Sequence, residues 1–384
     1  MNAQLHQRLS TDLAERKLRG LERQLHTTWH IDDAFVNLAD NDYLGLAGDP
    51  RLKAAAQAAV EQWGCSASAS PLITGYQSVH QDLEAVLCDW FDFPYGLIWT
   101  TGYAANSSVL SMLPRRGDLV LADRLIHNSM ITGILRSKAR LIRYRHCDLN
   151  HLESLLQRHA RNDRLIFVVT ETVFSMDGDY PDLVQMAVLK ERYGFVWIVD
   201  EAHALGWYGP RGNGLLAEAK ATEAADVIVG TMGKSMGSMG SFTLFRKEAV
   251  RRYLLNYAGE FIYSTYLAPP CAAAALKAIH IIQNMTPQRL QWHKRSKAFR
   301  RSLQRLGVEV PNGDSPIIPI ILGDVERTRE MARFLHKTGI LVAAICPPTV
   351  PEGLSRLRLS LKTSFNEDIQ GRILNEFKSG LVDC

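Results

Sequence analysis

The sequence predicts an α/β protein in which a large domain with a mostly parallel central sheet is followed by a smaller C-terminal α/β domain. Through the middle of the chain, short apolar runs alternate with stretches of helical period, which is the pattern of βαβ units. The 384 residues exceed the usual size of one domain, and a hydrophobic content of 46% is enough to bury a large core. We therefore divide the chain into an N-terminal segment (1–45), a large domain (46–270) and a small domain (271–384).

Composition argues against several classes of protein. The formal net charge is only +4, and Lys and Arg are interspersed with Asp and Glu, which argues against a nucleic acid partner and suits an anionic small molecule. The six cysteines are scattered without a CxxC pair, so we expect neither a disulfide framework nor a bound metal. No apolar run approaches the length of a membrane span, so no membrane partner is expected. We expect the protein to work in the reducing cytoplasm.

The N-terminal segment is predicted to begin with a helix over residues 1 to about 26. Leucines recur near helical period from Leu5 to Leu25, with charged residues between them. This helix can pack on the body of its own subunit or on a partner subunit. Alternatively, Arg16, Arg19 and Arg23 could reach the anionic tail of a substrate.

Short elements follow this helix. A strand is predicted at Phe35–Leu38, a turn at Asn41–Leu46, and an Ala-rich helix at Ala54–Trp63 that ends at Gly64. Beyond them, five apolar runs of strand length are separated by helical stretches. These runs are Gly96–Thr101, Leu119–Asp123, Leu165–Thr170, Phe195–Asp200 and Val227–Thr231.

Residues that can bind a ligand or take part in catalysis follow each of the five runs. Because the carboxyl ends of neighbouring parallel strands meet at one edge of a sheet, these residues are predicted to form a single ligand site there. In chain order they are Gly102 with Tyr103, His127, Glu171 with Ser175, His203, and Lys234.

The first two strand ends carry weak signals. Gly102 lies where a strand turns into a helix, and free N–H groups at such a position bind phosphate, with Tyr103 beside it. The glycine can equally serve the geometry of the turn alone. His127 precedes the predicted helix Ser129–Ser137, and a single histidine there can be structural or can contact a ligand.

The last two strand ends give the sharpest prediction. The hydrophobic strand FVWIVD places Asp200 at its end, where a buried carboxylate is costly without a cationic partner. A metal would need further ligands that the chain does not offer, whereas a protonated pyridine nitrogen needs one carboxylate, which makes the ring an electron sink. Lys234 follows the next strand in the glycine-rich stretch GTMGKSMGSMG, where it is either a solvated lysine or a covalent anchor.

The small domain is predicted to begin with an Ala-rich helix at Cys271–Ile282. Its sheet is expected to contain the runs Ile317–Leu322, Ile340–Ala344 and Arg356–Leu361. Alternation in SRLRLSL places Arg356 and Arg358 on one face of a half-buried strand. One arginine can face a cleft, or both can face solvent. The basic run His293–Arg301 is interpreted as the solvated face of an amphipathic helix.

Several of these motifs together resemble the α-oxoamine synthase family of pyridoxal phosphate (PLP) enzymes. VDEAHALGWYGPRGNG followed by GTMGKSMGSMG is the clearest match, and the similarity extends from NDYLGL through TGYAAN, TETVFSMDGDYPDL and FIYSTYLAPP to RLRLSL. It covers nearly the whole chain. The resemblance implies the PLP-dependent transferase fold type I, a decarboxylating C-acyltransferase activity, and a homodimer with shared active sites.

The resemblance also implies a role for each matching residue. Lys234 matches the Schiff-base lysine, which doubles as the proton-transfer base, Asp200 matches the partner of the pyridine nitrogen, and His127 matches the imidazole stacked on the ring. The other matches to the cofactor are Ser175 and His203 near the phenolic oxygen, Gly102, Tyr103 and Thr231 at the phosphate, and Ser264 and Thr265 at the phosphate of the opposite subunit.

Substrate residues follow from the same resemblance. Arg358 matches the arginine that holds the amino-acid carboxylate, with Arg356 as the competing assignment, and Asn41 matches a residue near that carboxylate. PPTVPEGLSRLRLSL is most similar to the members that join L-alanine to a pimeloyl thioester, of coenzyme A or of an acyl carrier protein, in biotin synthesis. Pro71 stands where many relatives carry an arginine, which puts the acyl pocket in doubt and leaves the cofactor chemistry intact.

Two other activities and a non-catalytic role are the alternatives. An aminotransferase shares the fold, the lysine and the aspartate, but the combination of SMDGD, DEAH and His127 favours a synthase. A sister synthase would use glycine or serine with another acyl group, and only PPTVP and the RLRLSL context argue against it. A non-catalytic subunit has no physical need for Lys234 together with Asp200 and His203.

Overall fold

The computed structural model describes residues 2–23, 25, 35–159 and 164–383. The chain folds as two compact units. The larger is Asn41–His293, and the smaller combines Met1–Asp40 with Lys294–Cys384. The boundary falls within helix α12 (Thr286–Arg305). Among the described residues, no helix combines the length and the apolar character that a membrane span requires.

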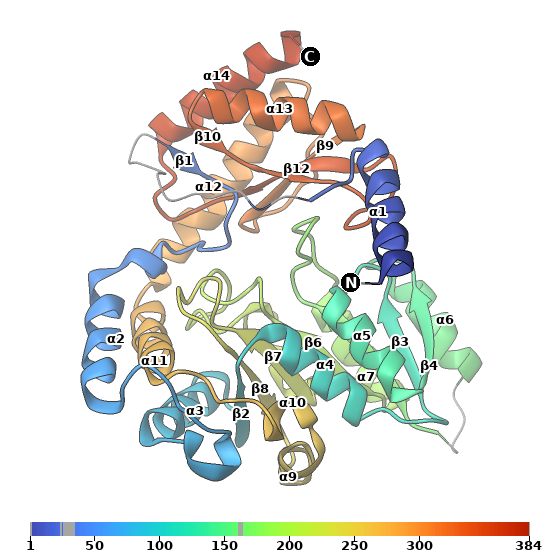
Figure 1. Ribbon diagram of the computed structural model, residues 1–384, viewed down its shortest axis with the longest axis vertical. Coiled ribbons are helices and arrows are strands. Elements are labelled where there is room, and N and C mark those ends of the chain that lie inside the picture. Colours follow the sequence, from blue (N-terminus) through green and yellow to red (C-terminus); the bar gives the residue numbers. More distant parts are fainter. Residues whose placement is uncertain (1, 24, 26–34, 160–163, 384) are drawn as a thin grey trace. The chain divides into compact units, whose positions relative to one another are not determined.

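The larger unit is built on a seven-stranded sheet with the order β2-β8-β7-β6-β5-β3-β4 (Figure 1). Neighbouring strands from β7 to β4 are parallel, and β8 is antiparallel to both of its neighbours. The predicted mostly parallel sheet is therefore confirmed. The strands are β2 (Tyr95–Trp99), β3 (Leu119–Asp123), β4 (Arg140–Tyr144), β5 (Ile166–Glu171), β6 (Val196–Asp200), β7 (Val227–Thr231) and β8 (Ser241–Phe245).

All five predicted runs form strands. Every residue of β3 and β7 is buried, and strands covered on both faces are continuous apolar runs that can be recognised in a sequence. The two unpredicted strands lack that signal. Exposed Arg140 and Arg143 interrupt β4 at the edge of the sheet, and Ser241 and Thr243 interrupt β8 although all of its residues are buried.

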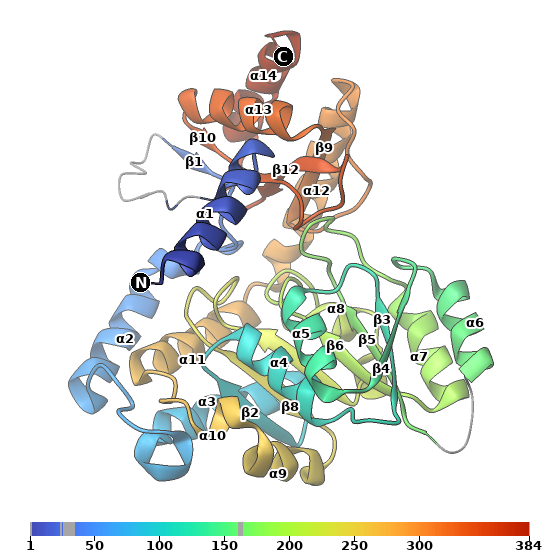
Figure 2. The same cartoon turned by 45° about the vertical axis from the view of Figure 1, so that its right-hand side comes forward.

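Helices pack around this sheet. In α4 (Gly102–Met112) and α5 (Asn128–Ser137), the backbones approach so closely that a Cβ on Gly133 would lie 2.8 Å from the carbonyl oxygen of Ser107. Helix α11 (Pro269–Gln283) packs along α2 (Pro50–Trp63) (Figures 1 and 2). The other helices described in this unit are the 3-10 turns Leu46–Gly48 and Thr222–Ala224, the π-helical turn Pro71–Gly75, α3 (Ser78–Phe91), α6 (Leu149–His159), α7 (Leu183–Tyr193), α8 (Leu215–Glu218), α9 (Glu248–Tyr257) and α10 (Gly259–Ile262).

The smaller unit contains two sheets. Strands β9 (Ile317–Gly323), β11 (Ala343–Ile345) and β12 (Ser355–Ser360) form an antiparallel sheet with β12 in the centre. Strands β1 (Val36–Asn37) and β10 (Ile340–Leu341) pair in parallel, so the predicted strand 340–344 is divided between the two sheets. The helices that belong wholly to this unit are α1 (Ala3–Leu18), α13 (Val325–Lys337) and α14 (Glu367–Asp383).

The two units differ from the predicted division. Helix α11 begins the predicted small domain but packs on α2 and α3, so it belongs to the larger unit. The predicted N-terminal segment is divided: the part up to Asp40 joins the smaller unit, where β1 pairs with β10, and the rest belongs to the larger unit. These pairings link segments far apart in the chain, and hydrophobic periodicity carries no information about them.

The N-terminal helix is shorter than predicted. Helix α1 ends at Leu18 because Gly20 has a φ of +63° and the N–H groups of Gly20 and Leu21 donate to the carbonyl oxygens of Lys17 and Arg16. Position 26, the predicted end, lies outside the described residues. Basic helix α12 is also less solvated than predicted, since Arg300 is buried and donates to carbonyl oxygens of the loop that precedes β9 and of Ile317, the first residue of β9.

Candidate active site

The carboxyl ends of β5, β6 and β7 place the central groups of the candidate site. Glu171 is the last residue of β5 and is opposite Asp200, the last residue of β6, in the register of the sheet. Strand β7 ends at Thr231, and Lys234 follows three residues later. The side chains predicted at this edge are thus brought together by parallel strands that are neighbours in space.

A chain of hydrogen bonds leads from Lys234 into the protein. Lys234 Nζ lies 2.6 Å from His203 Nε2, and His203 Nδ1 lies 2.7 Å from the hydroxyl oxygen of Tyr43. The Tyr43 hydroxyl is also 3.1 Å from Asn41 Oδ1, and Tyr43 is fully buried. Because Tyr43 engages Nδ1, the other ring nitrogen of His203 is directed at the lysine. Tyr43 was not predicted as a site residue, although it lies in the NDYLGL turn with Asn41.

Asp200 is held by neutral donors. Its Oδ2 accepts from Asn106 Nδ2 at 2.7 Å and its Oδ1 from the backbone N–H of Ala202 at 2.8 Å, and the residue is only 7% exposed. Within the part of the chain that the structure describes, no Lys, Arg or His forms an ion pair with this carboxylate. A buried carboxylate of this kind favours a cationic partner from a ligand, and a protonated pyridine nitrogen meets that need. The residues therefore fit PLP.

His127 is fixed by its backbone and its ring. The backbone N–H donates to Glu171 Oε1 at 2.6 Å, and ring atom Nδ1 caps helix α5 by accepting from the N–H of Ser129 at 3.3 Å. Burial lowers the pKa of His127, and the charge of Lys234 acts in the same direction, while Asp200 opposes them. The lowered pKa favours the neutral ring, which suits contact with a cationic pyridine ring.

The pKa of Glu171 depends on its burial and on the charge of Asp200. Burial raises the pKa of the Glu171 carboxyl well above its ordinary value, and the nearby negative charge of Asp200 raises it further. Lys234 and the N–H of His127 oppose this rise. Glu171 therefore favours the protonated form.

Buried Glu201 fixes the turn that begins at Asp200. Its carboxylate accepts from Thr172 Oγ1 at 2.6 Å and from the backbone N–H groups of Leu215 and Leu216 at 3.0 and 2.8 Å. A Cβ at Gly214 would lie 2.6 Å from this carboxylate, so the backbone approaches it closely. Burial raises the pKa of Glu201 to about 7. Sequence reasoning missed Glu201 because the neighbouring Asp200 and His203 explained the motif.

Of the residues predicted to bind the phosphate of PLP, Gly102 and Thr231 are neighbours, whereas the hydroxyl of Tyr103 is directed elsewhere. Gly102 begins α4, and a Cβ there would lie 3.8 Å from the side chain of Thr231 at the end of β7, so these two residues are neighbours. Thr231 Oγ1 accepts from the N–H of Gly233 at 3.2 Å. Tyr103 is 47% exposed and donates to Thr132 Oγ1 on α5 at 3.0 Å, so its hydroxyl is directed at that helix.

Three further predicted residues lie on turns. Ser175 is half-buried in the turn after β5. Ser264 and Thr265 follow α10, and Thr265 is exposed. The segment just beyond them is anchored, since the N–H of Tyr266 donates to the carbonyl oxygen of Ala69, directly before the turn that contains Pro71.

The predicted substrate arginines belong to the smaller unit. Arg356 and Arg358 lie on the central strand β12 and are 2% and 4% exposed, which excludes a solvated position for both. Arg358 donates to Ser360 Oγ at 2.9 Å and Arg356 to the carbonyl oxygen of Leu354 at 3.1 Å. Arg23 is exposed and lies 3.4 Å from Thr349 Oγ1 in the PPTVP segment.

A cavity of about 470 Å³ lies beside that segment in the smaller unit. Its lining includes Arg19, Leu21, Pro347 and Glu352, and Arg19 forms an exposed ion pair of 3.2 Å with Glu352. Residues 19–21, which follow helix α1, and the PPTVP segment are therefore neighbours, which neither motif predicted alone.

The fold and these groups define the class of protein. A mostly parallel sheet with a lysine and a buried carboxylate on adjacent strand ends is the arrangement of PLP-dependent enzymes of fold type I. A family model described as "Aminotransferase class I and II" matches residues 33–370. The chain belongs to that family, and within it to the α-oxoamine synthases.

Individual relatives agree with this placement. A protein of Geobacillus kaustophilus (strain HTA426), named "Putative 8-amino-7-oxononanoate synthase", is 41% identical and the match covers 92% of this chain and 90% of the relative. The solved 8-amino-7-oxononanoate synthase of Francisella tularensis superposes with a TM-score of 0.79 at 26% identity, covering 92% and 99% of the two chains. A serine palmitoyltransferase of S. paucimobilis, solved with PLP and myriocin bound, superposes with a TM-score of 0.91 at 25% identity, covering 98% and 97%.

Proposed function

We propose that this chain has 8-amino-7-oxononanoate synthase activity, the PLP-dependent condensation of L-alanine with a pimeloyl thioester in biotin synthesis. The observation that carries the proposal is the 41% identity to a relative with that name over 92% of the chain, together with a PLP-type site in the larger unit. In the overall reaction a carbon–carbon bond forms between the alanine Cα and the acyl carbonyl carbon. The thiol carrier leaves, and the alanine carboxyl leaves as carbon dioxide.

The residues of the larger unit would hold the cofactor. PLP, when bound, supplies a ring that takes up the electron pair left on the substrate Cα. Asp200 would accept the hydrogen bond of the protonated ring nitrogen, because neutral donors alone hold it in the described part of the chain. His127 would lie against the ring. The N–H groups at the start of α4 and the hydroxyl of Thr231 would bind the phosphate.

Lys234 would be both covalent anchor and proton-transfer base. The unprotonated amine is needed for both tasks. His203 Nε2, 2.6 Å from Lys234 Nζ, is placed to exchange a proton with it, and Tyr43 holds the opposite ring nitrogen so that this direction is maintained. Arg358 would bind the carboxylate of alanine, with Asn41 nearby, and Arg23 would serve the acyl substrate.

A homodimer with shared sites completes the proposal. The segment Ser264–Thr265 is expected to contact the phosphate bound by the opposite subunit. Exposure of Thr265 and the 85% exposure of the adjacent Tyr263 support a segment that is covered by a partner. Sedimentation analysis would give the subunit number.

The described cysteines Cys65, Cys88, Cys147, Cys271 and Cys346 are free thiols, which supports the proposed cytoplasmic location.

A sister synthase is the second candidate. The similarity in fold to a serine palmitoyltransferase, with a TM-score of 0.91, favours an activity with L-serine and a longer acyl group. Its identity to this chain is 25%, compared with 41% for the first relative. The choice of amino acid separates the two candidates directly.

The first experiment tests the cofactor and the anchor. Addition of PLP to the purified protein is expected to give a visible absorption band that Lys234→Ala abolishes and that Lys247→Ala, a change at an exposed lysine, leaves intact. Absence of the band in the wild type would refute the proposal. Exchange of the Cα proton in deuterated buffer should then be fastest with alanine. Fast exchange of serine or glycine with slow exchange of alanine would favour the sister synthases.

The second experiment tests the acyl substrate. The protein with alanine and a pimeloyl thioester of either carrier should release carbon dioxide and free thiol in equal amounts. Palmitoyl coenzyme A with serine is the matched alternative. A preference for the latter pair would reject the proposed substrates while leaving the PLP site in place.

A further inference from the structure

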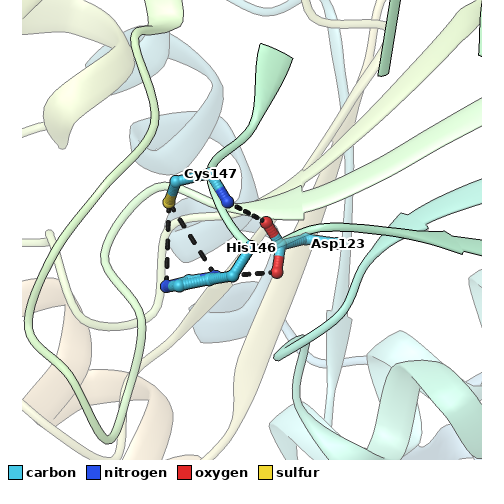
Figure 3. Close-up of side chains that lie close together, drawn as sticks. All are labelled: Asp123, His146 and Cys147. Atoms are coloured by element: carbon cyan, nitrogen blue, oxygen red, sulfur yellow. Dashed lines mark hydrogen bonds and ion pairs between the residues drawn. The ribbon is translucent and has the colours of Figure 1, made fainter. Parts of the chain in front are cut away.

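A cluster of polar side chains lies at the carboxyl ends of β3 and β4 (Figure 3). Asp123 is the last residue of β3 and is fully buried, and its Oδ1 lies 2.8 Å from Nδ1 of His146, which follows the end of β4. The other ring nitrogen of His146, Nε2, lies 3.0 Å from Oδ2 of Asp179, in the turn after β5. The proposed reaction uses none of these three residues.

A metal site is the first function to consider, because Asp123, His146 and Cys147 all carry ligand atoms. The geometry argues against it. The Sγ of Cys147 lies 3.9 Å from Nδ1 and 3.8 Å from Nε2 of His146, so the sulfur lies over the face of the ring (Figure 3). A metal bound to either nitrogen would lie in the ring plane, away from the sulfur. Both nitrogens, moreover, are already directed at carboxylates.

The partners of His146 determine its charge. A carboxylate only accepts hydrogen bonds, so each ring nitrogen must carry a proton, and the ring is a cation between two anions. Burial disfavours the charged ring, but the hydrogen bonds to Asp123 and Asp179 raise the pKa of His146 to about 12. The ring therefore stays charged throughout the neutral range.

Asp123 connects this cation to the turn that carries His127. Besides the ring, its Oδ1 accepts from the N–H of Leu125 at 2.8 Å, and its Oδ2 accepts from the N–H of Cys147 at 2.8 Å. The turn from β3 to His127 thus starts at a carboxylate with three donors. Its direction depends on the position of that carboxylate.

Asp179 connects the same cation to the turn that carries Ser175. The N–H of Phe174 donates to the carbonyl oxygen of Asp179, and the N–H of Gly178 donates to that of Phe174, both at 2.9 Å. The Phe174 ring also packs edge-on against His146, with centroids 4.4 Å apart and an angle of 85°. Ser175 lies inside this closed turn.

We propose that His146 is a positioning residue for the PLP site. By holding Asp123 and Asp179 to one charged ring, it sets the distance between two turns. One turn carries His127, assigned to the ring face of PLP, and the other carries Ser175, assigned to its phenolic oxygen. The inference rests on the proposed use of PLP.

Changes at Asp179 test the contact without touching the strand. Asp179→Ala removes the second anion and is expected to weaken PLP binding about tenfold, the size of one charge-assisted hydrogen bond. Asp179→Asn keeps an acceptor for Nε2 and should restore most of the affinity. His146→Gln can satisfy only one carboxylate and should match Asp179→Ala. Asp148→Asn is the control, since this carboxylate lies two residues from His146 but bonds to Arg145 and the N–H of His151.

Amide hydrogen exchange of the cofactor-free protein separates positioning from general stability. In Asp179→Ala, exchange should rise in the turns 124–128 and 173–179 and remain unchanged in the strands of the sheet. Wild-type affinity in both Asp179→Ala and His146→Gln, an equal loss in Asp148→Asn, or a uniform rise in exchange would each overturn the inference. If the wild type binds no PLP, the proposed function fails, and the exchange pattern still decides whether His146 fixes the two turns.

Discussion

The buried carboxyl of Glu201 should make the stability of the larger unit depend on pH. Burial raises its pKa from the ordinary value of 4.5 to about 7. A group whose pKa is raised by folding stabilises the protein below its unfolded pKa, and that contribution is lost as the pH rises through the folded pKa. The change from 4.5 to about 7 corresponds to about 3 kcal/mol, since one pKa unit equals about 1.4 kcal/mol.

Glu201→Gln isolates this contribution. The amide keeps the size of the side chain, but its nitrogen cannot accept a hydrogen bond, whereas the hydroxyl oxygen of the protonated carboxyl can accept one from Leu215 or Leu216. At pH 5 the variant should therefore be about 1–3 kcal/mol less stable. The variant lacks the titration, so its deficit should shrink by up to about 3 kcal/mol between pH 5 and pH 8.

Urea unfolding of the cofactor-free proteins at several pH values measures this prediction. Other titrating groups cancel in the difference between wild type and variant. A deficit that stays constant or grows with pH would refute the reasoning, because it would mean that Glu201 is ionised and well solvated by its donors throughout. Thr172→Val removes a donor that lowers the pKa of Glu201. This variant should therefore lose more stability than the wild type as the pH rises from 5 to 8.

Two more changes test other parts of the site. Arg358→Lys should raise the KM for alanine about tenfold, because lysine cannot make the bidentate contact of arginine with a carboxylate. Arg356→Lys should leave the KM within about twofold. Steady-state kinetics that reverse this order would assign the binding of the alanine carboxylate to Arg356. Tyr43→Phe leaves His203 Nδ1 buried without its hydroxyl partner and should lower the free energy of unfolding by about 1–3 kcal/mol, measured with urea. Equal stability of Tyr43→Phe and wild type would show that water replaces the hydroxyl.

The predicted features that agree with the structure are those with a local signal. Strands β3 and β7 were located to the residue because both faces are covered and the apolar run is continuous. Asp200 and Lys234 were placed together because the carboxyl ends of neighbouring parallel strands must meet. The division into units depends on pairings such as β1 with β10, which no local pattern encodes.

The supporting residues of the site were missed for the same reason. Asn106 bonds to Asp200 from a position 94 residues earlier in the chain. One signal could have found it, since Asn106 follows Gly102 by one helical turn and so shares the face of α4 that is directed at the sheet edge. Tyr43 and Glu201 carry no such signal, because Asn41, two residues before Tyr43, and Asp200, directly before Glu201, already explained the two motifs.

The residues assigned to the cofactor and those assigned to the substrate belong to different units. The residues assigned to PLP lie in Asn41–His293, and their supports Asn106, Glu171 and Tyr43 lie there as well. The arginines assigned to substrate lie in the other unit, on β12 and beside the PPTVP segment. Because the residues assigned to PLP and the residues that hydrogen-bond to them belong to the same unit, substitutions in the larger unit should alter PLP affinity and proton transfer. Changes on β12 should alter only the binding of alanine or the acyl chain, so relatives can diverge in substrate while the cofactor site is retained.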